Sequence, residues 1–267
     1  MTDVSVVVPT FRRPRLLGEA VRSALSQQDV GLEVLVVDDS PEGSAHAEVD
    51  SLTDPRVRYR RMEHPSGGRP ALVRNAGWPL ATGRYVHFLD DDDRLADGAY
   101  AALVAALEGR PEVGIAFGRV EPFGEDPGDL QHNQELFAES TRRARLSERI
   151  HSRYALLSSM LFCNPCLACS ACLIRREKLA VLGGFDARMT PFEDAEMFIR
   201  GIRCYGATFV DRPILRYRTG IPSLMHDLAE GVAPAAYRQI YRKYAAEHGR
   251  VELFAMQVLA RTLLRRV

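Results

Sequence analysis

The first half of the chain alternates short β-branched runs with stripes of helical period. Residues 4–8, 33–37, 56–62 and 84–89 have the length and composition of strands. A single helical stripe follows Pro14 and is formed by Leu16, Leu17, Ala20, Val21, Ala24 and Leu25. This alternation is typical of βαβ units, and it predicts an α/β fold around a mostly parallel sheet.

The second half of the chain has a less regular pattern. A helix that Asp97 can cap is predicted after the fourth strand, and residues 113–120 return to an extended pattern. Residues 121–148 are rich in Pro, Gly, Asp, Gln and Arg, and we interpret them as a long loop that contacts an acceptor or is disordered. A helix is expected from Glu193 to about Cys204. Two short strands complete the pattern, near Phe209 and Leu215.

The longest uncharged stretch, residues 155–174, is nominally long enough to cross a bilayer. Asn164 and Pro165 interrupt it together with several serines and cysteines. We therefore interpret it as a buried helix end and a strand, and we predict no transmembrane segment.

The C-terminal region combines an apolar stripe with a basic end. The stripe is formed by Tyr237, Ile240, Tyr241 and Tyr244, and the basic end contains Arg261, Arg265 and Arg266. We expect these helices to close the core. Peripheral docking on a membrane surface, or on a partner subunit such as a second copy in a homodimer, is the alternative.

Charge and cysteine content limit the possible partners and location. The 35 basic and 35 acidic residues cancel, so no global field recruits nucleic acid or an anionic membrane. The apolar run at 4–8 is far shorter than a signal sequence and lacks a basic flank. The cysteine count is odd, at 5. We therefore expect a cytoplasmic protein with reduced thiols.

Four consecutive carboxylates, Asp90, Asp91, Asp92 and Asp93, follow the fourth predicted strand. Such a cluster repels itself unless a cation neutralises it, and Mg²⁺ or Mn²⁺ prefers oxygen ligands while retaining waters and substrate phosphates. The run therefore indicates a metal-bound diphosphate. A solvated acidic turn, in which Asp93 or Asp97 caps the next helix, is the alternative.

Further polar residues follow the first and second strands. Ligands of an open α/β sheet lie beyond the carboxyl ends of its strands, so Thr10 and Asp39 are expected beside the acidic run. Phe11 can offer its ring to a nucleobase, and Asp39 can accept a hydrogen bond from a base edge such as a uracil N–H. Arg74 can pair with a diphosphate. Each segment alone is also compatible with an ordinary turn.

Carboxylates also occupy the first turn of the helix predicted from Glu193. Asp194 and Glu196 lie there, and acids in this position complement the helix dipole without any chemistry. A pair between Glu196 and Arg200, one turn later, fits that structural interpretation.

Taken together, these motifs resemble those of family 2 glycosyltransferases, in the usual order, from Val4 to about Tyr217. The motifs are Val-Val-Val-Pro-Thr-Phe at 6–11, Val-Val-Asp-Asp-Ser at 36–40, Arg-Asn-Ala-Gly at 74–77, Phe-Leu-Asp-Asp-Asp-Asp at 88–93, Gly-Gly-Phe-Asp at 183–186 and Glu-Asp at 193–194. The resemblance implies a GT-A fold with a Rossmann-like nucleotide-binding half. It places the catalytic domain at 1–220, with a donor half at 1–120 and an acceptor half at 121–220, and a C-terminal helical extension at 221–267.

The resemblance also implies a function and a set of site residues. The expected reaction is metal-dependent and inverting, and it moves a sugar from a nucleotide-diphospho-sugar to an acceptor hydroxyl. The expected nucleotide is UDP or dTDP. By position, Asp194 matches the catalytic base, Asp92 the principal ligand of Mn²⁺ or Mg²⁺, and Asp90 a ribose or metal contact. Because all four positions are Asp, the alignment can shift by one residue, so Asp91 is also a candidate. The nucleotide contacts are expected at Pro9, Thr10, Phe11, Asp39, Arg74, Asp90 and Asp91. The family's frequent histidine after Tyr-Arg is missing here, and His226 is the nearest one.

Other functions remain open at this point. A nucleotide-sugar binding protein without activity would keep the donor residues but lose the base. A sugar nucleotidyltransferase or diphosphate hydrolase could also use the acidic run, but it would be expected to show a phosphate loop rich in glycine and lysine near the first strand. The residues Cys163, Cys166, Cys169 and Cys172 recur every third position, which superficially resembles a metal-cluster motif. We interpret them as small core residues, because ferredoxin spacing is absent.

Overall fold

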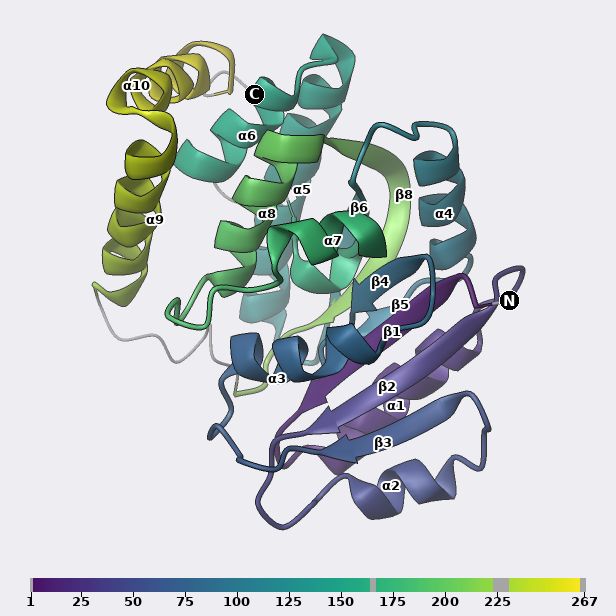
Figure 1. Ribbon diagram of the computed structural model, residues 1–267. Helices are drawn as coiled ribbons and strands as arrows, with labels where there is room; N and C mark the ends of the chain where they lie inside the picture. The colour runs from purple at the N-terminus through teal and green to yellow at the C-terminus, as the bar shows by residue number, and fades with distance from the viewer. Residues whose placement is uncertain (1, 164–166, 223–230, 265–267) are drawn as a thin grey trace.

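The computed structural model describes residues 2–163, 167–222 and 231–264, and within these residues the strands form one eight-stranded sheet (Figure 1). Its strand order is β3-β2-β1-β4-β7-β6-β8-β5. The strands are β1 (Val4–Thr10), β2 (Leu32–Asp38), β3 (Val57–Arg61), β4 (Tyr85–Phe88), β5 (Arg94–Leu95), β6 (Ile115–Phe123), β7 (Cys172–Arg175) and β8 (Ala207–Arg218). The four strands predicted in the first half are confirmed, to within one or two residues at each end.

Parallel pairing dominates the sheet. Strand β1 pairs in parallel with β2 and β4, β2 with β3, and β6 with β8. Strand β7 runs antiparallel to both β4 and β6, and β5 runs antiparallel to β8. The reversed strand β7 joins the N-terminal strands to β6 and β8 in a single sheet. The α/β fold with a mostly parallel sheet is therefore confirmed.

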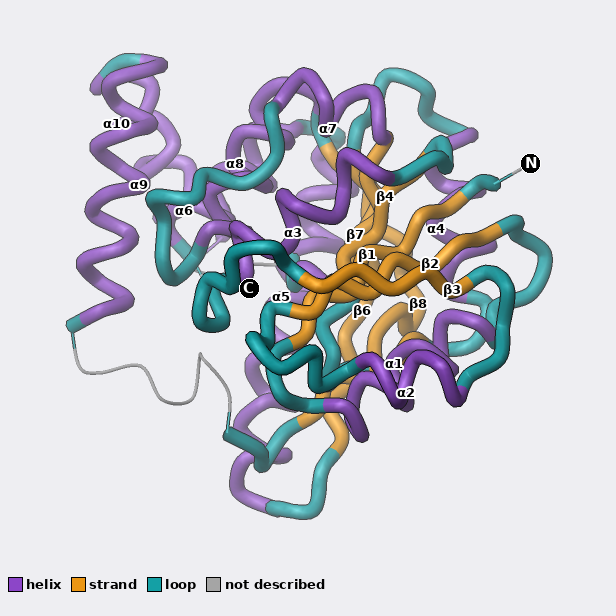
Figure 2. The backbone as a smooth tube through the Cα atoms, turned by 60° about the horizontal axis from the view of Figure 1, so that its bottom comes forward, coloured by secondary structure: helices purple, strands orange, loops and turns teal. Residues whose placement is uncertain are grey.

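Helices cover both faces of the sheet (Figures 1 and 2). One face packs on α1 (Pro14–Leu25), α2 (His46–Ser51) and α4 (Ala99–Glu108). The other face packs on α3 (Pro70–Gly77), α5 (Pro127–Ile150), α6 (Arg153–Phe162), α7 (Arg176–Leu182) and α8 (Glu193–Tyr205). Helices α9 (Val232–His248) and α10 (Arg250–Leu259) lie outside α6 and α8, away from the sheet (Figure 1). Three short turns of other helix types complete the described elements, at Trp78–Leu80, Cys169–Ala171 and Ala260–Leu264. Alternate side chains of β1 point to opposite faces of the sheet. Val6 and Val8 belong to the hydrophobic core on the α1 side, and Val7 belongs to the core on the α3 side.

The prediction of a long loop at residues 121–148 is wrong. Strand β6 extends to Phe123, and the 24-residue helix α5 follows. Asp126 caps α5 by accepting a hydrogen bond from the backbone N–H of Asp129 at 2.8 Å, and Pro127 occupies its first turn. The buried face of α5 carries Ser140, Arg143, Ala144 and Ser147 rather than a broad apolar stripe. The helix therefore lacks the periodic signal on which the prediction depended.

Two smaller predictions also need correction. Phe209 and Leu215 lie in one strand, β8, whose pairing with β6 is irregular around Arg119. Asp97 does not cap α4, because the capping position is Gly98, whose φ of 68° is in the left-handed region.

The C-terminal helices α9 and α10 pack on the rest of the domain. Ile240, Tyr244 and Met256 are buried in the core cluster, and the Tyr241 hydroxyl donates to the carbonyl oxygen of Leu161 at 2.7 Å. The core-closing interpretation of this stripe is confirmed. Helix α10 also exposes apolar side chains, namely Val251, Phe254 and Val258.

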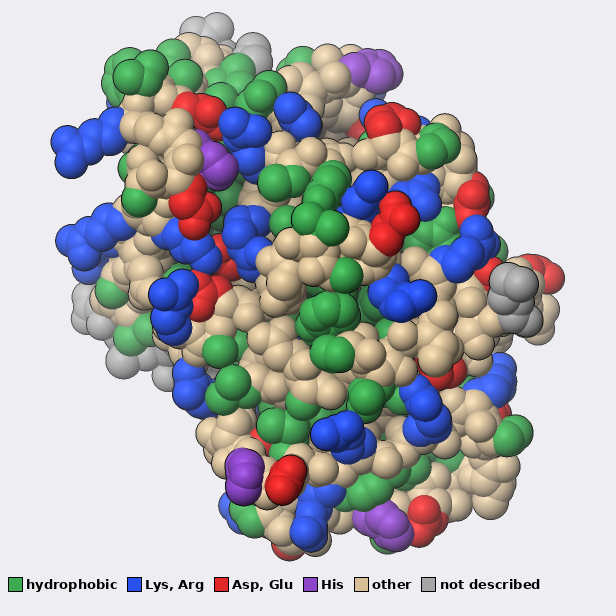
Figure 3. All heavy atoms as spheres, in the orientation of Figure 1, with side chains coloured by type: hydrophobic (Ala, Val, Ile, Leu, Met, Phe, Trp, Pro, Cys, Tyr) green, Lys and Arg blue, Asp and Glu red, His purple; other side chains and the backbone are tan. Residues whose placement is uncertain are grey.

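The uncharged segment at 155–174 contributes the buried helix α6 and strand β7, as predicted. Among the described residues, no helix combines the length and the hydropathy that a membrane span requires. Basic and acidic side chains are interspersed on the face seen in Figure 3, in line with the balanced net charge.

Candidate active site

The carboxyl ends of β1, β2 and β4 lie together at one edge of the sheet, because these strands pair in parallel. The backbone N–H of Asp39 donates to the carbonyl oxygen of Thr10 at 3.0 Å. The Thr10 hydroxyl in turn donates to Asp91 Oδ2 at 2.7 Å. The structure thus brings together polar residues from three separated segments, as the sequence predicted. Pro9 lies within β1, opposite Val37 of β2.

Asp39 is fully buried and organises the loop before α3. Its carboxylate accepts hydrogen bonds from the backbone N–H groups of Ser66 and Gly68, both at 2.6 Å, and from the Ser66 hydroxyl at 2.8 Å. A carboxylate has about four acceptor positions, so these three hydrogen bonds leave about one unused. The Phe11 ring lies against Gly68, where an added Cβ would be 3.5 Å from it. Phe11 and Asp39 therefore border the same loop.

Each carboxylate of the acidic turn has a different partner. Asp90 pairs with Arg74 at 2.7 Å, and Asp92 pairs with Arg13 at 2.6 Å. The buried Asp93 accepts from the backbone N–H of Arg218 at 3.1 Å rather than capping a helix. The capping alternative for Asp93 is therefore wrong.

Burial and mutual repulsion perturb the carboxylates of this turn. Burial, followed by the charge of Asp92, raises the pKa of Asp91 to about 7. Burial also raises the pKa values of Asp92 and Asp93, with Asp90 adding to the repulsion. A bound cation would favour the ionised form of these carboxylates.

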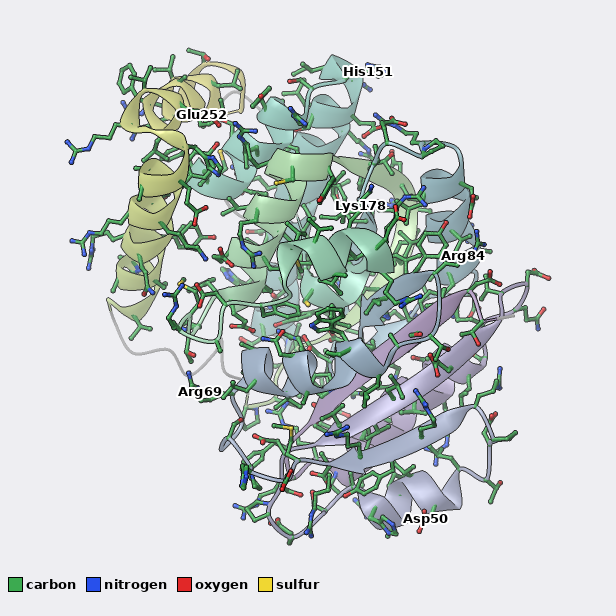
Figure 4. All side chains as sticks on the ribbon, viewed as in Figure 1. Asp50, Arg69, Arg84, His151, Lys178 and Glu252 are labelled. Carbon is green, nitrogen blue, oxygen red and sulfur yellow. The ribbon has the colours of Figure 1, made fainter. Side chains whose placement is uncertain are left out.

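Arg74 links the acidic turn to the start of α8. Its side chain is 5% exposed, and its Nη1 donates to Glu193 Oε1 at 2.6 Å while its Nη2 donates to Asp90 Oδ1 at 2.7 Å. The ring of Phe185, from the Gly-Gly-Phe-Asp motif, lies 5.4 Å below the guanidinium. In this structure Arg74 bridges two carboxylates, and its contact with a nucleotide stays a prediction. Arg69, at the N-terminus of α3, donates to the carbonyl oxygen of Ala187 at 2.6 Å (Figure 4).

Asp194 lies in the first turn of α8, beside this bridge. Phe192, just before the helix, has a φ of 70°, a left-handed conformation that is costly for a bulky residue and that recurs at functional sites. The half-buried Asp194 accepts a hydrogen bond from the backbone N–H of Ala195 at 2.8 Å. Burial, followed by the charge of Glu193, raises the pKa of Asp194 to about 6, although Arg74 opposes the shift. Burial and the charge of Glu193 therefore outweigh the charge of Arg74 and the hydrogen bond from Ala195, which lower the pKa.

Glu196, in contrast, has the structural role expected of it. It pairs with Arg200 one turn later at 2.7 Å and with Lys243 of α9 at 2.6 Å. Asp186 also pairs with Lys243, at 2.8 Å, so these acids hold α9 against α8.

Comparisons with known proteins identify the group to which this arrangement belongs. The family model described as glycosyl transferase family 2 matches residues 5–182, which are 178 of the 267 residues. The chain belongs to glycosyl transferase family 2. Relatives include the GalNAc(5)-diNAcBac-PP-undecaprenol beta-1,3-glucosyltransferase of Campylobacter jejuni, 38% identical over 106 residues, which are 39% of this chain and 34% of that protein. An uncharacterized protein of Mycobacterium tuberculosis is 29% identical over 202 residues, which are 74% of this chain and 61% of that protein.

Solved structures share the fold of this family 2 glycosyltransferase. S. aureus TarS in complex with UDP-GlcNAc superposes with a TM-score of 0.68 at 18% identity, over 92% of this chain and 66% of that one. The mannosyltransferase PcManGT of Pyrobaculum calidifontis, in complex with GDP-Man and Mn²⁺, superposes with a TM-score of 0.63 at 22% identity, over 98% of this chain and 68% of that one. The GT-A fold expected from the motifs is confirmed. The chain spans only about a third of the length of its Campylobacter relative.

The carboxylate oxygens of the acidic turn are the type of ligand atom that a hard cation such as Mn²⁺ or Mg²⁺ prefers. In the described part of the chain, no three His, Cys, Asp or Glu side chains converge closely enough to form a metal site. An ion held by Asp92 and Asp90 would therefore need further oxygens from a ligand or from water. His226 and Cys166 lie outside the described residues. Burial raises the pKa values of Cys169 and Cys172 well above the ordinary thiol value, as expected for inert core residues.

Sequence reasoning missed several residues of this glycosyltransferase site. Arg13 binds Asp92, and Ser66 binds Asp39. The chain is rich in arginine, so Arg13 had no distinguishing signal except its place between the first strand and Pro14. Ser66 had only the adjacent Gly67-Gly68 turn as a signal.

Proposed function

We propose that this family 2 glycosyltransferase is metal-dependent and inverting, and that it moves a sugar from a nucleotide-diphospho-sugar to an acceptor hydroxyl. In this proposal Asp194 is the general base that removes the proton of the hydroxyl. Asp92 and Asp90 hold Mn²⁺ or Mg²⁺, which neutralises the diphosphate leaving group when bound. Direct inversion needs a base at the acceptor hydroxyl and stabilisation of the negative charge on the leaving group, and the carboxylate and the cation would supply these.

The observation that carries the proposal is the bridge from the acidic turn to α8. Asp90, Arg74 and Glu193 are joined by contacts of 2.7 and 2.6 Å, and Asp194 is the next residue. The bridge fixes the proposed base relative to the proposed metal ligands through a buried guanidinium. With a pKa of about 6, Asp194 is largely ionised at neutral pH yet still basic enough to accept a proton.

The loop around Asp39 supports a nucleotide donor. Asp39 retains an acceptor position after its three hydrogen bonds, and the ring of Phe11 lies at the same loop. A base edge with an N–H satisfies that acceptor. Uracil and thymine carry one, as the proposed UDP or dTDP sugars require, and so does guanine. The complex of TarS with UDP-GlcNAc fits this choice, and the complex of PcManGT with GDP-Man and Mn²⁺ fits the requirement for a metal. Thr10 and Asp91 bind one another here and would serve the nucleotide as a pair.

The acceptor half is proposed to be residues 121–220, with the donor half at 1–120 and the helical extension at 221–267. Helix α5 and the start of α8 belong to this second half and lie on the same face of the sheet. A homodimer and a peripheral membrane contact stay hypotheses from the sequence.

Release of the nucleoside diphosphate from UDP, dTDP and GDP sugars, with Mn²⁺ or with EDTA, tests the proposal. We expect release with Mn²⁺ only, and a loss of about 100-fold to 10,000-fold in Asp194→Asn. Asp50→Asn is the matched control, because Asp50 is exposed on α2 (Figure 4). An inactive binding protein would bind the donor without release, whereas a hydrolase or nucleotidyltransferase would cleave the phosphate chain instead of the glycosidic bond. Equal activity in Asp194→Asn and the control contradicts the assignment of the base.

A further inference from the structure

Arg13 makes a three-way contact at the acidic turn. It immediately precedes α1, and its Nη1 donates to Asp92 Oδ2 at 2.6 Å and lies 3.6 Å from Asp91 Oδ1. Its Nη2 donates to the carbonyl oxygen of Pro222 at 2.5 Å. One guanidinium thus reaches both carboxylates in the middle of the acidic run and a backbone carbonyl beyond β8.

The other cations at the turn serve different groups. Arg74 pairs with Asp90 and Glu193, and Arg218 donates from its Nε to the backbone carbonyl of Asp92 at 2.9 Å and from its Nη2 to Glu19. Among the described residues, Arg13 is therefore the cation whose guanidinium meets the carboxylate of Asp92.

Arg13 is also the arginine of this group that has room to move. Its side chain is 32% exposed, compared with 5% for Arg74 and 16% for Arg218. Both terminal nitrogens of Arg74 are fixed by buried or half-buried carboxylates, so its release would leave uncompensated charges. The exposed stem of Arg13 can change direction at much lower cost.

We propose that Arg13 is the counter-cation of the metal-free acidic turn and exchanges partners when the donor binds. Its guanidinium leaves Asp92, which is then available as a metal ligand, and pairs with the diphosphate of the donor. The planar guanidinium matches two phosphate oxygens as well as it matches a carboxylate, so the exchange conserves its hydrogen bonds. The inference rests on the proposed metal-dependent function and adds a residue that both weakens metal binding before the donor arrives and strengthens donor binding afterwards.

Calorimetric titration of Mn²⁺ in the absence of nucleotide tests the first half of the exchange. Because Arg13 and Mn²⁺ compete for Asp92, Arg13→Gln should bind Mn²⁺ about tenfold more tightly than the wild type, as a charge-assisted hydrogen bond of about 1.5 kcal/mol no longer opposes the ion. Arg13→Lys keeps the charge and should stay within about twofold of the wild type. Arg15→Gln, which removes an exposed charge two residues along the chain, is the matched control and should also stay within about twofold.

Titration of UDP at saturating Mn²⁺ tests the second half. Arg13→Gln should bind UDP about tenfold more weakly, and Arg13→Lys should lie between it and the wild type. Unfolding curves of all variants confirm that they are folded. The exchange is overturned if the wild type binds Mn²⁺ and UDP together while Arg13→Gln has unaltered or weaker affinity for Mn²⁺ alone. A wild type that binds Mn²⁺ neither alone nor with UDP, dTDP or GDP contradicts the proposed function itself, and the exchange with it.

Discussion

Replacing Glu193 by Gln should shift the acid limb of the pH–rate profile, because Glu193 helps to raise the pKa of Asp194. The pKa of Asp194 is about 6, with burial as the first cause and the negative charge of Glu193 as the second. If Asp194 is the general base, activity follows its ionised fraction, so the wild type should retain about half of its maximum at pH 6 and about a tenth at pH 5.

The magnitude of the shift follows from the contacts of Arg74. In Glu193→Gln the negative charge beside Asp194 is lost, and the charge of Arg74 is less compensated, so both changes lower the pKa of Asp194. A decrease of about one unit would raise the activity at pH 5 from about a tenth to about half of the maximum, a gain of about fivefold. The side-chain amide oxygen can still accept the hydrogen bond from Arg74.

The assay is the slow transfer of sugar to water, followed as release of the nucleoside diphosphate at saturating Mn²⁺, which requires no knowledge of the acceptor. The acidic turn is the competing source of an acid limb, because burial and Asp92 raise the pKa of Asp91 to about 7 without a cation. Repeating the profile at a higher Mn²⁺ concentration separates the two groups. A limb that moves with Mn²⁺ and stays in place in Glu193→Gln would refute the assignment to Asp194.

Four further outcomes are expected. Arg74→Met should lose about 3 to 5 kcal/mol of unfolding free energy in urea, because it leaves Glu193 buried without its cation, whereas an exposed control, Arg15→Met, should change by less than about 0.5 kcal/mol. Without Mn²⁺ the raised pKa values of Asp91, about 7, and Asp194, about 6, should lower the unfolding free energy as the pH rises from about 4 to about 7, whereas the lowered pKa of the buried His87, about 4, acts in the opposite direction. The unfolding free energy of Asp91→Asn relative to the wild type should therefore rise over this range, and a difference that does not change with pH would contradict the pKa of Asp91. Gly184→Ala should destabilise the fold, because its φ is 75° and a Cβ would lie 2.5 Å from the Asn75 side chain; an unchanged melting temperature would refute this. Cys169→Ala should have the same iron and zinc content as the wild type in elemental analysis, because Cys169 is a buried core thiol; a metal present in the wild type and absent from the variant would support a metal cluster.

The sequence predicted the N-terminal strands well, because they depend on local periodicity, and it predicted that Thr10 and the acidic run lie together, because the strands before them pair in parallel. The runs at 4–8 and 33–37 became β1 and β2, and parallel pairing then placed the acidic run beside Thr10. Helix α5 was missed because its buried face is mostly small or polar, so neither period was visible.

The contacts that organise the site could not be predicted from local patterns. Arg13 lies 79 residues from Asp92, and Arg74 lies 119 residues from Glu193. Which arginine meets which acid depends on tertiary geometry, and arginine is abundant throughout the chain. The sign of the pKa shift at Asp194 also depends on tertiary geometry, because burial raises the pKa and the charge of the distant Arg74 lowers it.

Thermal unfolding in the presence of UDP, dTDP or GDP, with Mn²⁺ or with EDTA, tests the central claim most directly. A nucleotide at about 100 times its dissociation constant stabilises the folded state by about 2.7 kcal/mol, which corresponds to about 5 to 10 °C for a chain of this size. The account predicts such a rise for at least one nucleotide when Mn²⁺ is present, and its loss both in EDTA and in Asp92→Asn. Equal melting temperatures with and without Mn²⁺ for all three nucleotides would contradict it.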